Sequence, residues 1–334
     1  MIERIPNYYP QFTCLAGTCP DSCCQEWEVD IDPKTAKLYR DLPGKLGDAL
    51  REKMRMEDGT VYLTISDRRC PMWRQDGLCE IQCQLGHDAL SQTCQAFPRL
   101  THDYGDFVER GLELSCPAAA KLILSGENQE ISAYKLPGEG SGDYDREVMD
   151  ILLQSREVLL SFWEEMPYPL PKMLAITLLY AHEVQAELDG GKTAVLSAED
   201  ALADALSYAQ GGDLDALRTF FLGLEILTPA WESRLGSPAP ALQWENCNRA
   251  LVRYFICRYW LQAVSDYDVL CRAKFAVVAC LLIASLGGEM VETAQLFSKE
   301  IENDADNVEA ILDGAYTCPA MTDVALLGLL LKGV

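Results

Sequence analysis

Four cysteines fall within eleven residues near the beginning of the chain, in the stretch CLAGTCPDSCC. Cys19 and Cys23 are separated by three residues, so a tight loop or helical turn can aim both thiolates at one centre, with Cys14 close by. Cysteines at this density form a disulfide knot, a structural zinc site or an iron–sulfur cluster. The rest of the chain has to distinguish these three kinds of site.

A second group of cysteines follows in the first 116 residues: Cys70, Cys79, Cys83, Cys94 and Cys116. Asp76-Gly77 predicts a β-turn between the first two of them, and the last precedes a predicted helix that begins AAAKLIL. The remaining five cysteines are scattered through apolar helical sequence and are interpreted as core residues: Cys247, Cys257, Cys271, Cys280 and Cys318.

Disulfides are disfavoured by compartment and size. The opening MIERIPNYYPQF has mixed charge, two prolines and no apolar segment of the kind that a signal peptide requires. We therefore expect the protein in the cytoplasm, where thiols stay reduced. With 334 residues the chain also exceeds the small secreted domains that depend on disulfides.

The choice between zinc and iron–sulfur rests on the ligand types. The chain has three histidines, His87, His102 and His182, and none recurs at a zinc-finger interval. An all-thiolate site suits either an iron–sulfur cluster or a zinc ion held by four cysteines. The paired C-x2-C knuckles of zinc ribbons are absent from the sequence, so the spacing favours iron–sulfur, with zinc as the alternative.

Composition excludes several other classes of partner. The balance of 49% hydrophobic and 24% charged residues is typical of a folded globular protein. A net charge of −23 argues against binding nucleic acid or an anionic membrane surface, because both require a basic footprint. The longest apolar run, FAVVACLLIASLGG, is shorter than the roughly 20 residues that span a bilayer and is interpreted as a buried helix.

The predicted fold class is mainly α, with a loop-rich cysteine-cluster region packed on a C-terminal helical bundle. Residues 1–125 form the metal- or cluster-binding region, with little strand beyond GTVYLTI, and 145–334 form the all-helical domain. The Gly- and Ser-rich stretch between them is interpreted as a connector. Ser197 and Asp200 predict a helix cap.

Two charged stretches have competing interpretations. The stripe RALVRYFICRYW carries Arg249, Arg253 and Arg258, which could line a cleft for an anionic cofactor group. We favour a buried helix whose arginines reach the surface along their stems. The acidic segment SKEIENDADNVE is interpreted as a solvated face.

Three stretches together resemble the flagellin lysine N-methylase family of bacteria. They are NYYPQFTCLAGTCPDSCCQEWEVDID, CPMWRQDGLCEIQCQLGHDALSQTCQAFPR and ERGLELSCPAAAKLIL. A weaker similarity to the same family occurs in RALVRYFICRYWLQAV and LFSKEIENDADNVEAIL. The cysteine-rich part is also similar to a broader group of zinc- or iron-chelating proteins that carry C-x3-CC and a later C-x-x-F-P.

The resemblance implies the site, the cofactors and the partner. It implies transfer of a methyl group from S-adenosylmethionine to flagellin lysines and a cysteine-ligated iron–sulfur cluster, expected to be 4Fe–4S. Cys83 lies outside the family pattern, and Glu26 stands where the C-x3-C-x2-C motif of radical enzymes would need a cysteine. The family's metal-binding cysteines fall on Cys14, Cys19, Cys23, Cys24, Cys70, Cys79, Cys94 and Cys116.

The sequence identifies neither a catalytic base nor a methyl-donor site. Methyl transfer from a sulfonium to lysine needs alignment and loss of the ammonium proton, whose pKa is normally about 10.4. No glycine-rich Rossmann loop is recognisable. The alternative functions are a non-catalytic zinc- or cluster-binding protein and a redox sensor.

Overall fold

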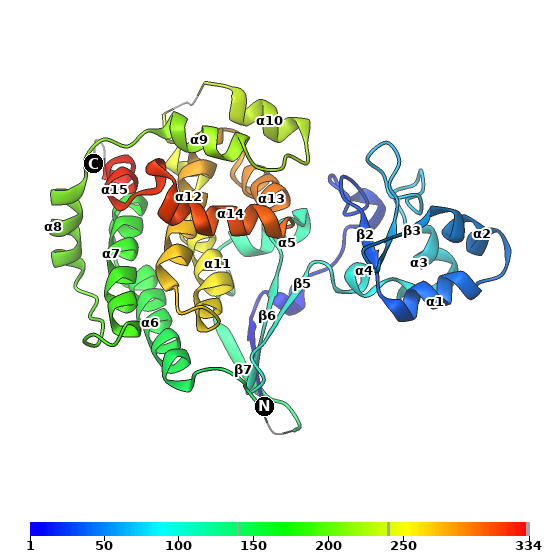
Figure 1. Ribbon diagram of the computed structural model, residues 1–334, viewed down its shortest axis with the longest axis horizontal. Coiled ribbons are helices and arrows are strands. Elements are labelled where there is room, and N and C mark those ends of the chain that lie inside the picture. The colour runs from blue at the N-terminus through cyan, green and yellow to red at the C-terminus, as the bar shows by residue number, and fades with distance from the viewer. Residues whose placement is uncertain (139, 239–240, 332–334) are drawn as a thin grey trace.

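The computed structural model describes residues 1–138, 140–238 and 241–331 as two lobes of unequal size (Figure 1). Within these residues the chain forms fifteen α-helices and seven β-strands. The prediction of a mainly α fold is confirmed. Two separate hydrophobic cores underlie the two lobes.

The smaller lobe forms a core from residues 29–90. Its elements are β2 (Val29–Ile31), α1 (Pro33–Asp41), α2 (Gly44–Lys53), β3 (Met54–Glu57), β4 (Thr60–Leu63), α3 (Glu80–Leu85) and α4 (Gln92–Ala96). The strands form an antiparallel sheet in the order β2-β4-β3. Asp58-Gly59 joins β3 to β4 with both residues at positive φ, as a two-residue hairpin turn requires. Alternation along β4 then buries Val61 and Leu63.

A four-stranded sheet belongs to the larger lobe. Its order is β5-β6-β1-β7, from β1 (Ile2–Pro6), β5 (Arg99–Asp103), β6 (Phe107–Leu112) and β7 (Ile131–Lys135). Strand β1 pairs with β6 in parallel and with β7 in antiparallel register. The expectation of little strand beyond GTVYLTI is wrong, and β7 lies inside the stretch interpreted as a connector. These short strands depend on partners far away in the sequence, so no local pattern announces them.

The larger lobe is otherwise helical. Its helices are α5 (Pro117–Leu124), α6 (Arg146–Glu165), α7 (Leu170–Leu188), α8 (Ala198–Tyr208), α9 (Leu214–Leu222), α10 (Pro229–Gly236), α11 (Arg249–Tyr259), α12 (Val269–Leu286), α13 (Met290–Ile301), α14 (Ala305–Thr317) and α15 (Asp323–Leu331). The predicted cap is present, because the Asp200 N–H donates to Ser197 Oγ at the start of α8.

Helix α12 is the centre of the larger core. It is apolar enough and long enough to cross a membrane, and all of its residues are buried inside the molecule. Its burial confirms the interpretation of FAVVACLLIASLGG as a buried helix. A helix that is apolar on every side needs neighbours all round, and α7, α11, α13, α14 and α15 supply them.

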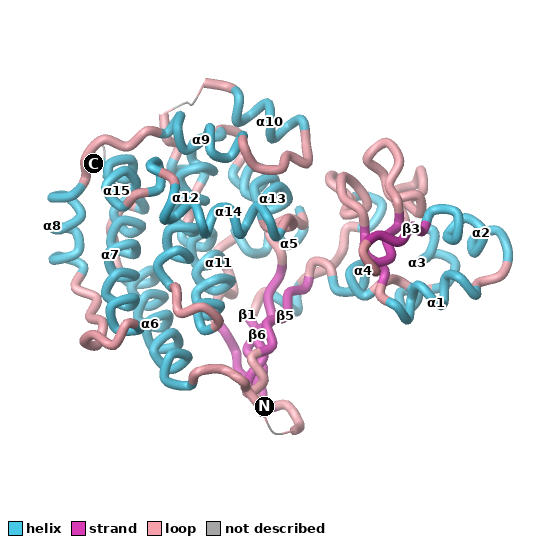
Figure 2. The backbone as a smooth tube through the Cα atoms, in the orientation of Figure 1, coloured by secondary structure: helices cyan, strands magenta, loops and turns pink. Residues whose placement is uncertain are grey.

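The two cores divide the chain at different places from the predicted regions. Tyr8, Phe12 and residues 107–124 pack in the larger core, together with the helices of the larger lobe. The division into domains 1–125 and 145–334 stays a prediction. Strand β5 follows α4 and carries the chain from the smaller lobe into the four-stranded sheet (Figure 2). Of the cysteines in the first 116 residues, Cys70 belongs to the smaller core, with Cys24 and Cys79 packed against it, and Cys116 belongs to the larger core.

Candidate functional site

The structure brings five of the predicted cysteines together in the smaller lobe: Cys23, Cys24, Cys70, Cys79 and Cys94. Cys24 is central, because its thiol hydrogen-bonds with those of Cys23 and Cys70. The Cys70 N–H also donates to the Cys24 carbonyl at 2.9 Å. Cys94 interacts electrostatically with Cys24 and Cys79. We name this set the inner thiol group.

The other three predicted cysteines, Cys14, Cys19 and Cys116, form the outer thiol group. Cys116 interacts electrostatically with both of the others. Cys14 also acts on Cys23, so the two groups adjoin. The Ala16 N–H donates to Cys14 Sγ at 3.4 Å, which fixes the loop locally.

The backbone presents N–H groups to several of the sulfurs. Cys79 and Cys116 are the N-cap residues of α3 and α5. Neither side chain forms a cap hydrogen bond. Burial raises the pKa of both thiols, and the peptide N–H groups of the following helical turn oppose that shift. Peptide N–H groups near a sulfur favour the thiolate, which is the form that binds metal.

The pKa values in the inner group show how its charge is shared. Hydrogen bonds from Cys23 and then from Cys70 lower the pKa of Cys24. The same interaction with Cys24 raises the pKa of both partners. Adjacent thiols therefore compete for one negative charge, and a cation placed among them would relieve the repulsion between thiolates.

The donor chemistry fits a soft metal centre. Several thiols that lie close together, with peptide N–H groups nearby, suit an iron–sulfur cluster or a tetrathiolate zinc ion. In the part of the chain that the structure describes, no three His, Cys, Asp or Glu side chains are already spaced as a closed ligand set. Loading would thus need the thiols to move together.

The remaining cysteines lie outside the two groups. Cys83 is exposed on α3, one turn after Cys79. Cys247, Cys271 and Cys280 are buried, as expected for core residues. The interpretation as a core residue fits Cys257 less well, because Cys257 is half-buried and lines a cavity.

Helix α13 connects the thiol groups to the larger lobe. Asp21, between Cys19 and Cys23, pairs with Lys299 Nζ at 2.7 Å and accepts from Gln295 Nε2 at 2.9 Å. Gln295 also donates to the Ser115 carbonyl at 2.7 Å, next to Cys116.

The interpretation of SKEIENDADNVE as a solvated face is wrong for its first part, because residues 298–302 are all buried. It holds for most of the second part, where Asn303, Asp306 and Glu309 are exposed. The sequence contains one indication of this burial, the apolar spacing of Leu296, Phe297 and Ile301 around the charged residues.

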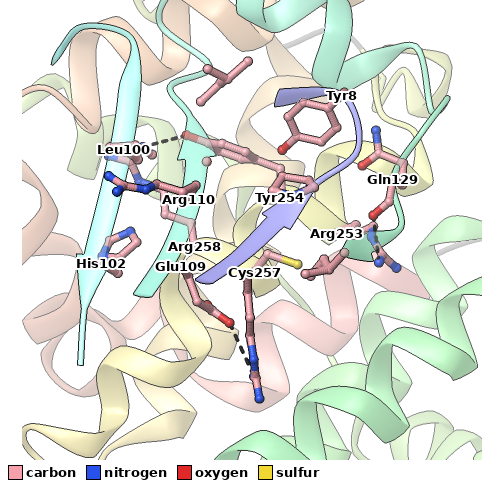
Figure 3. Close-up of a pocket in the computed structure, with 15 residues that line it drawn as sticks. Tyr8, Leu100, His102, Glu109, Arg110, Gln129, Arg253, Tyr254, Cys257 and Arg258 are labelled. Carbon is pink, nitrogen blue, oxygen red and sulfur yellow. Dashed lines mark hydrogen bonds and ion pairs between the residues drawn. The ribbon is translucent and has the colours of Figure 1, made fainter. Parts of the chain in front are cut away.

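A cavity of about 60 Å³ lies between the four-stranded sheet and α11 (Figure 3). Helix α11 supplies Arg253, Tyr254, Cys257 and Arg258 to its lining. Arg258 pairs with the buried Glu302 at 3.1 Å.

The prediction that the arginines of α11 reach the surface is therefore wrong for two of them. The side chains of Arg253 and Arg258 are only 13% and 11% exposed. Arg249 binds the carbonyl groups of Trp163 and Met166 at the end of α6.

Comparison with known proteins identifies three with similar sequences. It is 32% identical over 149 residues to the flagellar biosynthetic protein FliU of Salmonella muenchen, a match that covers 39% of this chain and 86% of FliU. Two lysine-N-methylases also match, from Salmonella choleraesuis strain SC-B67 at 34% over 130 residues and from Salmonella typhimurium strain LT2 at 33% over 129 residues. The chain belongs to the family of FliU and the lysine-N-methylases.

The matches with the two lysine-N-methylases are partial. They cover 36% of this chain and 32% of either relative. No protein-family model matches the chain. No solved structure matches it either.

Proposed function

We propose that the protein is a protein-lysine N-methyltransferase that uses S-adenosylmethionine to methylate lysines of flagellin. The observation that carries this proposal is the shared sequence with two proteins named lysine-N-methylase, together with the match over 86% of FliU. FliU is named as a flagellar biosynthetic protein, which supports a flagellar substrate. We expect the reaction to occur in the cytoplasm, where the free thiols would stay reduced.

The chemistry is a polar displacement. The neutral lysine nitrogen attacks the methyl carbon, the carbon–sulfur bond breaks, and S-adenosylhomocysteine leaves with the electron pair. The lysine must first lose a proton, and a dry site or a nearby positive charge lowers its pKa. The protein therefore has to align two substrates and exclude water.

We further propose that the inner and outer thiol groups hold an iron–sulfur cluster of the 4Fe–4S type. The inner group alone offers more cysteines than the four that such a cluster uses. When bound, the cluster would supply a rigid link among loops that come from both lobes. The displacement itself transfers no electrons, so we assign the cluster a structural role.

The test of the activity combines the anaerobically purified protein with flagellin and methyl-labelled S-adenosylmethionine. We expect label on lysine side chains, located by mass spectrometry of flagellin peptides, and none when flagellin is replaced by a lysine-containing protein without flagellar function. Absence of transfer to flagellin by a protein that holds its full metal content would reject the proposal.

The cysteine arrangement also supports a second candidate, a non-catalytic metal-binding protein. Metal analysis distinguishes the two candidates together with the activity test. A brown protein with iron and acid-labile sulfide is expected for the cluster. A colourless protein with one zinc ion and no methyl transfer would favour the second candidate.

A further inference from the structure

The cavity between the four-stranded sheet and α11 belongs to neither thiol group. We propose that it binds the amino-acid end of S-adenosylmethionine, with the carboxylate of the donor among the arginines. This inference rests on the proposed function and assigns the donor a place in the molecule. The ligand class is an α-amino acid whose side chain extends out of the cavity.

The charge of the lining favours a carboxylate. Four arginines line the cavity, Arg4, Arg110, Arg253 and Arg258, against one carboxylate, Glu109, in a chain whose net charge is −23. Both oxygens of Glu109 are held by the buried Arg156 at 2.8 and 2.5 Å, and Arg4 lies 3.7 Å away. Two guanidinium groups thus share one carboxylate at this end of the cavity.

The other three arginines also have carboxylate partners, and Glu113 lies near Arg258 as well, which limits the kind of anion. Arg110 pairs with Glu3 at 2.9 Å, Arg253 with Glu164 at 2.6 Å and Arg258 with Glu302 at 3.1 Å. A phosphate with two charges would need more uncompensated positive charge than the lining offers. A single carboxylate needs less, and guanidinium groups bind carboxylates with good geometry.

Two polar side chains in the lining, those of His102 and Tyr8, can reach a bound ligand. His102 Nε2 is buried and has no hydrogen bond among the described residues. Tyr8 is 8% exposed and lines the same cavity. Buried groups of this kind normally bond to protein, water or ligand, so both are available to a bound carboxylate.

The size of the cavity fits the amino-acid end alone. A volume of about 60 Å³ accommodates a few water molecules, or a carboxylate with its α-carbon and ammonium group. The side-chain amide of Gln129 lies in the lining opposite His102 and offers an acceptor for the ammonium group (Figure 3). The adenosine and the reactive methyl would then extend beyond the cavity, where a protein lysine can approach.

The test compares two ligands on the metal-loaded protein by isothermal titration calorimetry. S-adenosylhomocysteine carries the amino-acid end, whereas 5′-methylthioadenosine lacks it. The variants Y8F and H102N each remove one polar group of the lining, and R110Q removes one charge. The control variants are Y9F, next to Tyr8, and R40Q on the exposed face of α1.

We expect each cavity variant to weaken S-adenosylhomocysteine binding about tenfold, in proportion to the loss of one hydrogen bond to a charged group. Binding of 5′-methylthioadenosine should stay as in the unmodified protein, and the controls should change neither. Y8F removes a single oxygen atom, so it tests the cavity even where R110Q lowers stability. Melting temperatures check that each variant is folded.

The opposing results separate this inference from the proposed function. Normal S-adenosylhomocysteine binding by all three folded cavity variants would overturn the cavity as the donor site and leave the methyltransferase standing. Failure of the unmodified protein both to bind S-adenosylhomocysteine and to transfer methyl would overturn both.

Discussion

Cys24 shows at the level of one residue why the cysteine-rich loops fold as they do. Its carbonyl accepts a hydrogen bond from the Cys70 N–H, so a backbone hydrogen bond joins two loops that are distant in sequence. Its thiol interacts by hydrogen bonds with the thiols of Cys23 and Cys70, and these interactions lower its pKa. One residue therefore brings together the first cysteine stretch and the second.

A serine at this position should disrupt metal binding. We expect C24S to lose most of its iron and acid-labile sulfide, because a hydroxyl is a poor ligand for a soft metal. The matched control is C83S, which changes an exposed thiol outside the two groups. Iron and sulfide assays on anaerobically purified protein measure the effect, and equal contents in C24S and C83S would contradict the assignment.

Glu300 provides a test of pH dependence. Burial raises the pKa of its carboxyl above the usual 4.5, although Thr228, the Leu227 N–H and the charge of Lys299 oppose the shift. An acid whose folded pKa is raised binds its proton more tightly in the folded state. The cost of ionising it is absent below the unfolded pKa and is present in full above the folded pKa.

The variant E300Q removes that cost at every pH. We therefore expect the free energy of unfolding of the unmodified protein to improve relative to E300Q as the pH falls from about 7 to about 4.5. Urea unfolding at the two pH values measures the difference. A difference between the two proteins that is independent of pH would show that burial does not perturb this carboxyl.

At the scale of elements, α13 holds the cysteine loops against the larger lobe. The ammonium group of Lys299 is buried beside Asp21 and lies 5.5 Å from the centre of the Trp27 ring. Gln295, one turn earlier, holds both Asp21 and the Ser115 carbonyl. One helix thus contacts both ends of the outer thiol group.

Breaking this pair should loosen the attachment. We expect D21N to lower the free energy of unfolding by about 1–3 kcal/mol, since it leaves a buried ammonium group without its counter-charge. The double variant with K299M should lose less than the sum of the single variants. Thermal and urea unfolding measure both effects.

The same helix offers the control. Glu292 forms an exposed pair with Arg234 at 2.8 Å, and E292Q should cost less than about 1 kcal/mol. Equal losses in D21N and E292Q would mean that burial of Lys299 adds nothing to the strength of its pair.

At the scale of the whole molecule, the separation of two hydrophobic cores suggests two units of stability. The smaller core contains residues 29–90, whereas the larger one includes α12 and its neighbours. The inner thiol group packs in and against the smaller core, so a metal centre there would stabilise the small lobe more than the large one. Small cores gain most from such a link.

Removal of the metal should therefore act unequally. We expect amide hydrogen exchange to accelerate within 29–97 after chelation, while α12 stays protected, because its burial does not depend on the cysteines. Mass spectrometry of peptic peptides measures this before and after chelation. Uniform acceleration over both lobes would show a single cooperative unit.

The sequence by itself determined the helical character, the buried helix, the cap at Ser197 and the cysteines to consider. Helix periodicity, caps and turns are encoded within a few neighbouring residues, so they can be recognised locally. The tertiary structure alone decided the parallel pairing of Ile2 with Phe107, the burial of Lys299 and Glu300, and the arginine-lined cavity. It also divided the cysteines into inner and outer groups. These features depend on contacts between distant segments, whose side chains and backbone groups become neighbours only when the two cores have formed.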